Sequence, residues 1–289
     1  MFGECHAHLF MNGKNYREAV ALHKNGVQEQ DIREKLKQYQ NSGVTFIREG
    51  GDVLGVSSRA AQLAPEYGIT YRSPVFAIHR NGHYGGIVGY GFDTMKEYHS
   101  LVKKAAGEEA DFIKVMFSGI MDFAREGHLT EEPLDKGDIR EMIHIAHEEG
   151  FAVMAHVNGA KAVLNAVEAG VDSVEHGNFV DEDCLQAMAE SRAVWVPTYV
   201  TITNLIGSGR FDDASLLRLK EHQGEKIKRG WELGVKIALG SDAGAFCVPH
   251  GQGIWDEYRE LGALLGGGRE LDGRFEAAEA EIRRRFARE

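Results

Sequence analysis

The sequence has few cysteines and lacks a long hydrophobic run. Its three cysteines, Cys5, Cys184 and Cys247, are an odd number and show no Cys-x-x-Cys spacing. A disulfide framework is therefore not expected, and a reducing cytoplasm is the natural setting. No apolar run reaches the length of a membrane span, and the start shows no signal-peptide pattern. We therefore expect a soluble, cytoplasmic protein.

Positive charge is also scarce. Lys and Arg number 33 against 44 Asp and Glu, which gives a formal net charge of -11. The run Arg283-Arg284-Arg285 lies among acidic residues and indicates a solvated helix face. This balance argues against nucleic acid or an anionic membrane as the main partner and favours a small-molecule substrate. It leaves a homo-oligomer open.

The chain shows no domain linker, no low-complexity tract and no phosphate-loop glycine pattern. Instead, strand-like apolar runs alternate with helical patterns along its whole length. The expected strands cover 2–9, 44–48, 71–78, 111–117, 152–157, 173–177, 193–199 and 235–242. Such alternation predicts an α/β protein with a parallel sheet, and 289 residues suit a (β/α)₈ TIM barrel better than an open doubly wound sheet. We predict one barrel domain over 1–289, in which 270–289 form a C-terminal helix.

Polar side chains gather at the carboxyl ends of these expected strands. His6 and His8 point to the same face of the first strand because strand side chains alternate. Alone, this pair is equally compatible with packed histidines. The other polar residues at strand ends or within strands are Lys114, His156, His176 and Asp242. Because barrel enzymes build their sites at the carboxyl ends of the strands, we expect all six to converge. Histidines in a barrel interior need polar partners or a metal.

This set resembles the metal-binding pattern of the amidohydrolase superfamily. Several local stretches are similar to its imidazolonepropionase-like and Xaa-Pro (Xaa-Arg) dipeptidase branch. They are Gly43-Val44-Thr45, Phe112-Ile113-Lys114-Val115-Met116, Ala155-His156-Val157-Asn158-Gly159, Val174-Glu175-His176-Gly177, Gly240-Ser241-Asp242-Ala243-Gly244 and the loop Asn81-Gly82-His83-Tyr84-Gly85-Gly86. The resemblance runs in order from Gly3 to about Gly253.

The resemblance implies two divalent metal ions, with zinc expected. His6, His8 and Asp242 would hold the more buried ion. His156 and His176 would hold the other, and Lys114 would bridge both as a carboxylated lysine. A free ammonium cannot ligate a cation, whereas the carbamate formed with carbon dioxide offers two oxygens. Burial beside cations lowers the pKa of a lysine, which makes that reaction accessible.

The implied activity is hydrolysis of a C–N bond, in an amide, a peptide or a cyclic amide, by a metal-activated hydroxide. Asp242 would be catalytic, taking a proton from the water and delivering it to the leaving nitrogen.

The residues alone leave other interpretations open. The same centre could hydrolyse an ester or phosphoester bond, or the barrel could bind a metal or ligand without turnover. Lys114 could be a plain structural lysine beside a single metal. A Schiff-base aldolase would not need the surrounding histidines. Single-metal nucleoside deaminases expect His-Ala-Gly-Glu where this chain has His156-Val157-Asn158-Gly159.

Substrate contacts are less well defined by the sequence. The loops 82–93, 118–130 and 200–212 are expected to line the pocket, because loops after barrel strands carry binding residues. We name His83, Tyr199 and His250 as candidate substrate-binding residues, although Tyr199 could equally pack in the core.

Most relatives also carry a small β-sandwich built from both chain ends. The first expected ligand here is residue 6, and the charged segment 270–289 does not look like half of a sandwich. The sequence therefore predicts a barrel without the usual accessory domain.

Overall fold

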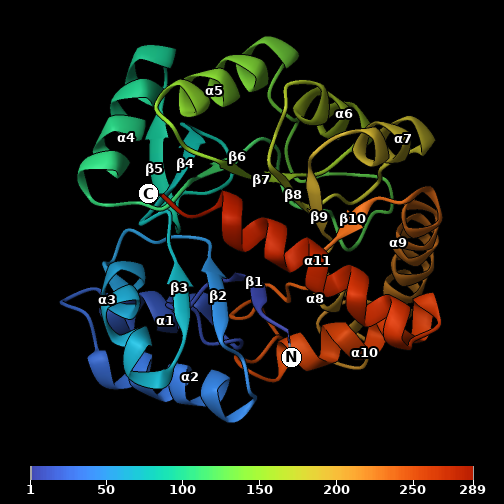
Figure 1. Ribbon diagram of the computed structural model, residues 1–289, viewed down its shortest axis with the longest axis horizontal. Helices are drawn as coiled ribbons and strands as arrows, with labels where there is room; N and C mark the ends of the chain where they lie inside the picture. The colour runs from blue at the N-terminus through green and yellow to red at the C-terminus, as the bar shows by residue number, and fades with distance from the viewer. Residues whose placement is uncertain (1, 289) are drawn as a thin grey trace.

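A computed structural model describes residues 2–288 (Figure 1), so residues 1 and 289 of the predicted domain lie outside the described part. The strands are β1 (Glu4–Ala7), β2 (Phe46–Glu49), β3 (Thr70–Arg72), β4 (Ala77–Arg80), β5 (Gly89–Phe92), β6 (Ile113–Met116), β7 (Val153–Val157), β8 (Ser173–His176), β9 (Val194–Val196) and β10 (Lys236–Ile237). The helices are α1 (Tyr16–His23), α2 (Glu29–Asn41), α3 (Val56–Leu63), the 3₁₀ helix η1 (Ala64–Tyr67), α4 (Met95–Gly107), α5 (Lys136–Glu148), α6 (Ala160–Glu168), α7 (Glu182–Glu190), α8 (Val200–Thr203), α9 (Asp213–Leu233), α10 (Gly253–Leu265) and α11 (Arg269–Arg285). No helix among residues 2–288 is long and apolar enough to cross a membrane.

All strand pairs in the two sheets are parallel. One sheet has the order β1-β2-β3 and the other has the order β10-β9-β8-β7-β6-β4-β5. Strand β1 also meets the segment that follows β10. There, Cys5 N donates to Leu239 O at 3.0 Å, and Asp242 N donates to His6 O at 2.8 Å. The strands thus follow one another in the order of a (β/α)₈ barrel, as the alternating pattern predicted.

The predicted strand 71–78 is divided in two. β3 pairs with β2, and β4 pairs with β6. Four residues that include Pro74, which has no N–H to donate, separate the two pieces.

Strand β5 was not predicted, and it pairs with the outer edge of β4. A Cβ on Gly89 would lie 2.0 Å from the Ala77 carbonyl oxygen, so only glycine allows this close approach. A glycine-rich run gives no periodic apolar signal, which explains the omission.

Helix α11 covers the amino ends of the barrel strands and crosses in front of them in Figure 1. Its buried Ala278 and Ile282, together with Phe286 directly after the helix, join a core cluster with residues such as Cys5 and Phe46. The Gly3 backbone N–H also donates to the Glu279 carboxylate at 2.6 Å. The charged tail is therefore amphipathic, and it seals the end of the barrel opposite the polar strand ends.

Aspartate and threonine side chains fix the loops that lead from the strands into the helices. Thr94 forms a capping box at the start of α4, and Asp135, Asp181 and Asp212 accept hydrogen bonds from the first turns of α5, α7 and α9. Each cap satisfies backbone N–H groups that the helix itself cannot pair. The loops bordering the carboxyl ends of the strands are therefore anchored at their distal ends.

Candidate metal centre and active site

The six polar residues singled out in the sequence line one small cavity at the carboxyl ends of the strands. Its volume is about 70 Å³. Its lining residues are His6, His8, Met11, Tyr84, Val88, Lys114, Met116, His156, His176, Asp242 and Ala245. Residues from both ends and the middle of the chain thus meet in one place.

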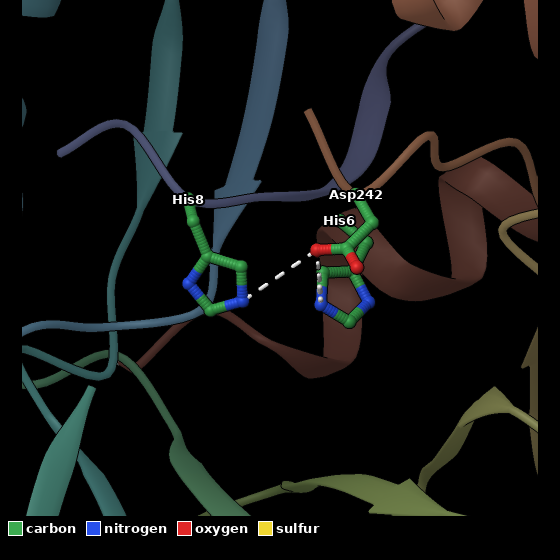
Figure 2. A group of neighbouring side chains, drawn as sticks. All are labelled: His6, His8 and Asp242. Atoms are coloured by element: carbon green, nitrogen blue, oxygen red, sulfur yellow. Dashed lines mark ion pairs between the residues drawn. The ribbon is translucent and has the colours of Figure 1, made fainter. Parts of the chain in front are cut away.

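His6, His8 and Asp242 form the tightest group in this cavity (Figure 2). One Asp242 carboxylate oxygen lies 3.6 Å from Nε2 of His6 and 3.6 Å from Nε2 of His8. One possible ligand atom from each residue lies within 4.8 Å of the others. Gly50 makes room for this arrangement, because a Cβ there would be 2.2 Å from the His8 ring. Two nitrogens and one carboxylate oxygen are a donor set that suits a divalent metal such as zinc.

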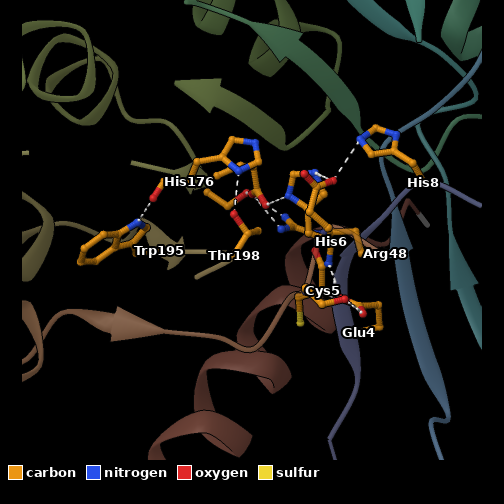
Figure 3. Close-up of polar contacts among 12 residues, drawn as sticks. Glu4, Cys5, His6, His8, Arg48, His176, Trp195 and Thr198 are labelled. Atoms are coloured by element: carbon orange, nitrogen blue, oxygen red, sulfur yellow. Dashed lines mark hydrogen bonds and ion pairs between the residues drawn. The ribbon is translucent and has the colours of Figure 1, made fainter. Parts of the chain in front are cut away.

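The His6 ring is held from behind by a buried charged pair (Figure 3). The Glu175 carboxylate accepts a hydrogen bond from His6 Nδ1 at 2.7 Å. Arg48 donates to the other Glu175 oxygen at 2.8 Å, and both side chains are fully buried. Because Glu175 fixes the proton on Nδ1, the His6 Nε2 lone pair faces the cavity. This nitrogen has no hydrogen-bond partner among the described residues.

His156 and His176 lie beside this group: their ring centroids are 4.6 Å apart, and the His176 ring lies 5.1 Å from the His6 ring. Nδ1 of His176 shares a 2.7 Å hydrogen bond with the Thr198 hydroxyl. Nε2 of His156 lies 3.3 Å from the Gly119 carbonyl oxygen. These contacts occupy one nitrogen of each ring and leave His176 Nε2 and His156 Nδ1 as the nitrogens able to ligate a cation.

Burial sets the protonation of the cavity. Burial, reinforced by the nearby Lys114 ammonium, lowers the pKa of both His8 and His156 to about 3. The pKa values of His6 and His176 are lowered in the same direction, chiefly by burial. All four histidines are therefore neutral at pH 7, which is the form that binds metals.

Lys114 is almost fully buried, and its amine has no hydrogen-bond partner in the described part of the chain. Burial lowers the pKa of Lys114 to about 8, and it raises the pKa of Asp242 to about 7. A buried amine without a partner is costly unless another group satisfies it. The orphaned Lys114 Nζ and His6 Nε2 atoms, which face the same cavity, thus fit a metal centre.

Strained backbone accompanies this arrangement. His176, Thr198 and Asp242 have positive φ angles of 65°, 48° and 59°. Non-glycine residues rarely adopt this conformation, and such outliers concentrate at functional sites. The strain lies at the ends of β8, β9 and the segment after β10, where the chain turns to aim these side chains.

A larger cavity of about 220 Å³ adjoins the small one. Tyr84, His156, His176, Asp242 and Ala245 line both. The rest of its wall is formed by Ile120, Met121, Phe123, Asn158, Asn178, Thr201, Leu205, Arg210, Phe211 and Phe246. All three loops expected to line the pocket contribute to it. The loop after β10 contributes Phe246, which the sequence did not single out.

The three candidate substrate-binding residues line neither cavity. His83, whose side chain is about a third exposed, faces Glu131, and its Nδ1 lies 3.8 Å from a carboxylate oxygen of that residue. Tyr199 is buried and donates its hydroxyl proton to the Lys220 carbonyl oxygen at 2.7 Å. His250 is also buried, between the Tyr39 hydroxyl and the Met11 carbonyl oxygen. The structure therefore does not bring these three side chains to the cavity walls, because position in a loop does not fix which way a side chain points.

Two residues that the sequence did not single out lie directly beside residues that it did. Tyr84, which follows His83, packs its ring 4.9 Å from the His156 ring. Glu175, which precedes His176 in β8, accepts a hydrogen bond from His6 across the barrel. Both lie in stretches that carried the family resemblance.

The amidohydrolase family profile matches residues 2–271. The chain belongs to the amidohydrolase family. An uncharacterised protein of Mycobacterium tuberculosis is 32% identical over 136 residues, covering 45% of this chain and 36% of that protein. Ochratoxinase of Aspergillus niger is 26% identical over 212 residues, covering 72% of this chain and 40% of that enzyme. The chain thus matches two fifths or less of the length of these relatives.

Solved structures of other proteins share the fold of the chain. A Xaa-Pro dipeptidase with bound methionine superimposes with a TM-score of 0.74 at 21% identity, over 99% of this chain and 74% of that structure. The structure of Aspergillus niger ochratoxinase gives a TM-score of 0.74 at 19% identity, over 96% of this chain and 69% of that structure. At this level of identity the likeness supports the barrel fold.

Proposed function

We propose that this amidohydrolase-family chain hydrolyses the C–N bond of a small amide or peptide at a divalent metal centre. The observation that carries the proposal is the convergence of four neutral histidines, Asp242 and Lys114 on a 70 Å³ cavity that opens beside a larger, mostly apolar one. The family membership and the names of its structural neighbours, among them a dipeptidase and a bottromycin amidohydrolase, support the choice of C–N bond.

We assign two metal sites to the small cavity. His6, His8 and Asp242 would hold one divalent ion, with zinc expected, and His156 and His176 would hold the second. Lys114 would bridge them as a carbamate, since its buried amine has a lowered pKa and no other partner. When bound, such ions polarise a carbonyl group and acidify a water molecule.

Asp242 is placed to move the proton in this reaction. Its carboxylate reaches toward both His6 and His8, and it also lines the larger cavity where a substrate would lie. A carboxylate in this position can accept a proton from the attacking water and return it to the leaving nitrogen. His156, His176 and Tyr84 also line both cavities, and they would orient the amide of the substrate.

We also propose a reducing cytoplasm as the setting of the reaction, as expected from the sequence. The three cysteines are all free, and Cys5 and Cys184 are buried in the core. Burial raises the pKa of the Cys184 thiol to about 12, so this residue stays protonated and unreactive.

Metal analysis combined with a hydrolysis screen tests the proposal. We expect the purified protein to hold a divalent metal, and we expect it to hydrolyse members of a panel of N-acyl amino acids, dipeptides and cyclic amides. A chelator should abolish turnover, and added zinc should restore it. His156→Asn should lose metal, whereas His144→Asn, which changes an exposed helix residue, should not.

Two results would overturn the proposal. Stoichiometric metal without turnover of any amide would indicate a binding barrel. Turnover of esters or phosphoesters alone would show that the enzyme does not hydrolyse C–N bonds.

A further inference from the structure

We propose that Arg210 determines substrate specificity by binding a carboxylate group on substrates that are otherwise apolar. This inference rests on the proposed function, since it assigns a substrate class to the same site. Arg210 lies in the loop between α8 and α9, and its side chain lines the larger cavity.

The chemistry of the larger cavity makes Arg210 distinctive. Apolar and aromatic side chains form much of the wall: Ile120, Met121, Phe123, Leu205, Phe211 and Phe246. The lining includes one Asp or Glu, namely Asp242, and one Lys or Arg, namely Arg210. Asp242 belongs to the wall shared with the metal cavity. A ligand in the larger cavity would therefore meet a mostly apolar surface with one fixed positive charge.

Arg210 forms no ion pair with any acidic side chain within residues 2–288. The nearest acidic residues in the sequence, Asp212 and Asp213, are engaged elsewhere. Asp212 caps α9 by accepting a hydrogen bond from Ser215 N at 2.8 Å, and Asp213 accepts one from Gly207 N at 2.8 Å. The guanidinium is therefore available to an anionic ligand.

Aromatic rings hold this guanidinium at the cavity wall. Its central carbon lies 4.5 Å from the ring centroid of Phe246 and 5.6 Å from that of Phe211. Phe211 is itself stacked on Phe123, with ring centroids 5.1 Å apart. Stacking leaves the N–H groups at the edge of the guanidinium free, and this planar fork matches both oxygens of a carboxylate. Arg210 is thus held in place without losing its donors.

The positive charge of Arg210 contrasts with the overall charge of the chain. A net charge of -11 repels anions in general. A local cation beside an apolar wall would therefore distinguish ligands that carry a carboxylate from neutral ligands of the same shape. N-acyl amino acids and dipeptides with an aromatic or aliphatic side chain have this combination.

Binding of two matched, non-hydrolysable probes tests the assignment. Calorimetry would compare 3-phenylpropanoate with its neutral amide, 3-phenylpropanamide, on the zinc-loaded full chain. We expect the wild type to prefer the carboxylate, and we expect Arg210→Met to reduce that affinity about 10- to 100-fold while changing amide binding less than about threefold. Arg210→Lys, which keeps the charge without the fork, should restore part of the loss. Arg218→Met is the control, because Arg218 lies outside the cavity lining and faces Glu126.

Either of two results would overturn the assignment. The wild type could bind both probes equally, or the carboxylate preference could survive in Arg210→Met, which would place the anion on the metal centre. Because the probes are not hydrolysed, the test is independent of turnover. The expected binding pattern without hydrolysis of any amide would refute the proposed function and leave the role of Arg210 standing.

Discussion

The small and large cavities are neighbours that are built in opposite ways. The small one is lined mainly by strand-end side chains, several of which are fixed from behind by a buried partner, as Glu175 fixes His6 and Thr198 fixes His176. The large one is lined mainly by loop residues, many of them apolar. From this difference we infer that the barrel would set the chemistry and that the loops would set the choice of ligand. Changes in the first cavity should therefore alter metal content and kcat, and changes in the second should alter KM.

The largest effect is expected for Asp242→Asn. The asparagine keeps the shape of the side chain but cannot exchange a proton, and it is a weaker metal ligand. We expect kcat to fall about 10³- to 10⁴-fold, near the upper end of what general acid–base catalysis supplies. Steady-state kinetics and circular dichroism would measure activity and folding together. A folded Asp242→Asn protein with near-normal kcat would show that the small cavity is not where the chemistry takes place.

The next largest effects are expected for Glu175 and Thr198, which hold the rings of His6 and His176 by hydrogen bonds. Glu175 accepts hydrogen bonds from His6, Arg48 and Ser173 with its two carboxylate oxygens. In Glu175→Gln only one side-chain oxygen remains to accept them. We expect metal affinity to fall about 10- to 100-fold and the free energy of unfolding to fall by roughly 1–3 kcal/mol. Thr198→Val removes one hydrogen bond to His176 and should lower metal affinity by about tenfold. Metal titration with a competing chelator would measure both variants. The comparison between the cavities would need revision if Phe246→Leu, in the large cavity, lost as much metal as Glu175→Gln.

Much of the small cavity could be predicted from the sequence, and the physical reason is periodicity. A strand fixes which face a side chain occupies, so His6 and His8 had to point together and His156 and His176 had to reach the same end of the barrel. The supporting residues were harder to predict. Glu175 and Arg48 read as ordinary strand residues, and their pairing depends on the barrel bringing β8 and β2 across from each other. The loop residues were hardest. His83 and Tyr84 are adjacent, and only the folded loop decides that Tyr84 faces the cavity.

A smaller effect is expected for the apolar wall. Phe246→Leu keeps an apolar side chain but removes the ring that lies beside the Arg210 guanidinium. We expect KM for an aromatic N-acyl amino acid to rise about 3- to 10-fold, because a cation–π contact and part of the apolar surface are lost. Metal content and kcat should stay near the wild-type values. A large fall in kcat with unchanged KM would mean that this wall helps to align the reacting bond and does more than select the ligand.

The smallest effect is expected for His83→Ala. His83 follows β4, as a substrate contact might, but its side chain is about a third exposed and faces Glu131. Its neighbour Tyr84 donates its backbone N–H to the same Glu131 carboxylate at 2.6 Å and places its ring against His156. We expect His83→Ala to change KM and kcat less than about twofold. The reason is that the exposed contact with Glu131 contributes little energy. Tyr84→Ala is the matched variant one residue away, and it should raise KM severalfold because its ring lines both cavities. If the two variants were equally impaired, the loop would act as one unit on the substrate, and the division of roles between strand ends and loops would not extend to this side of the site.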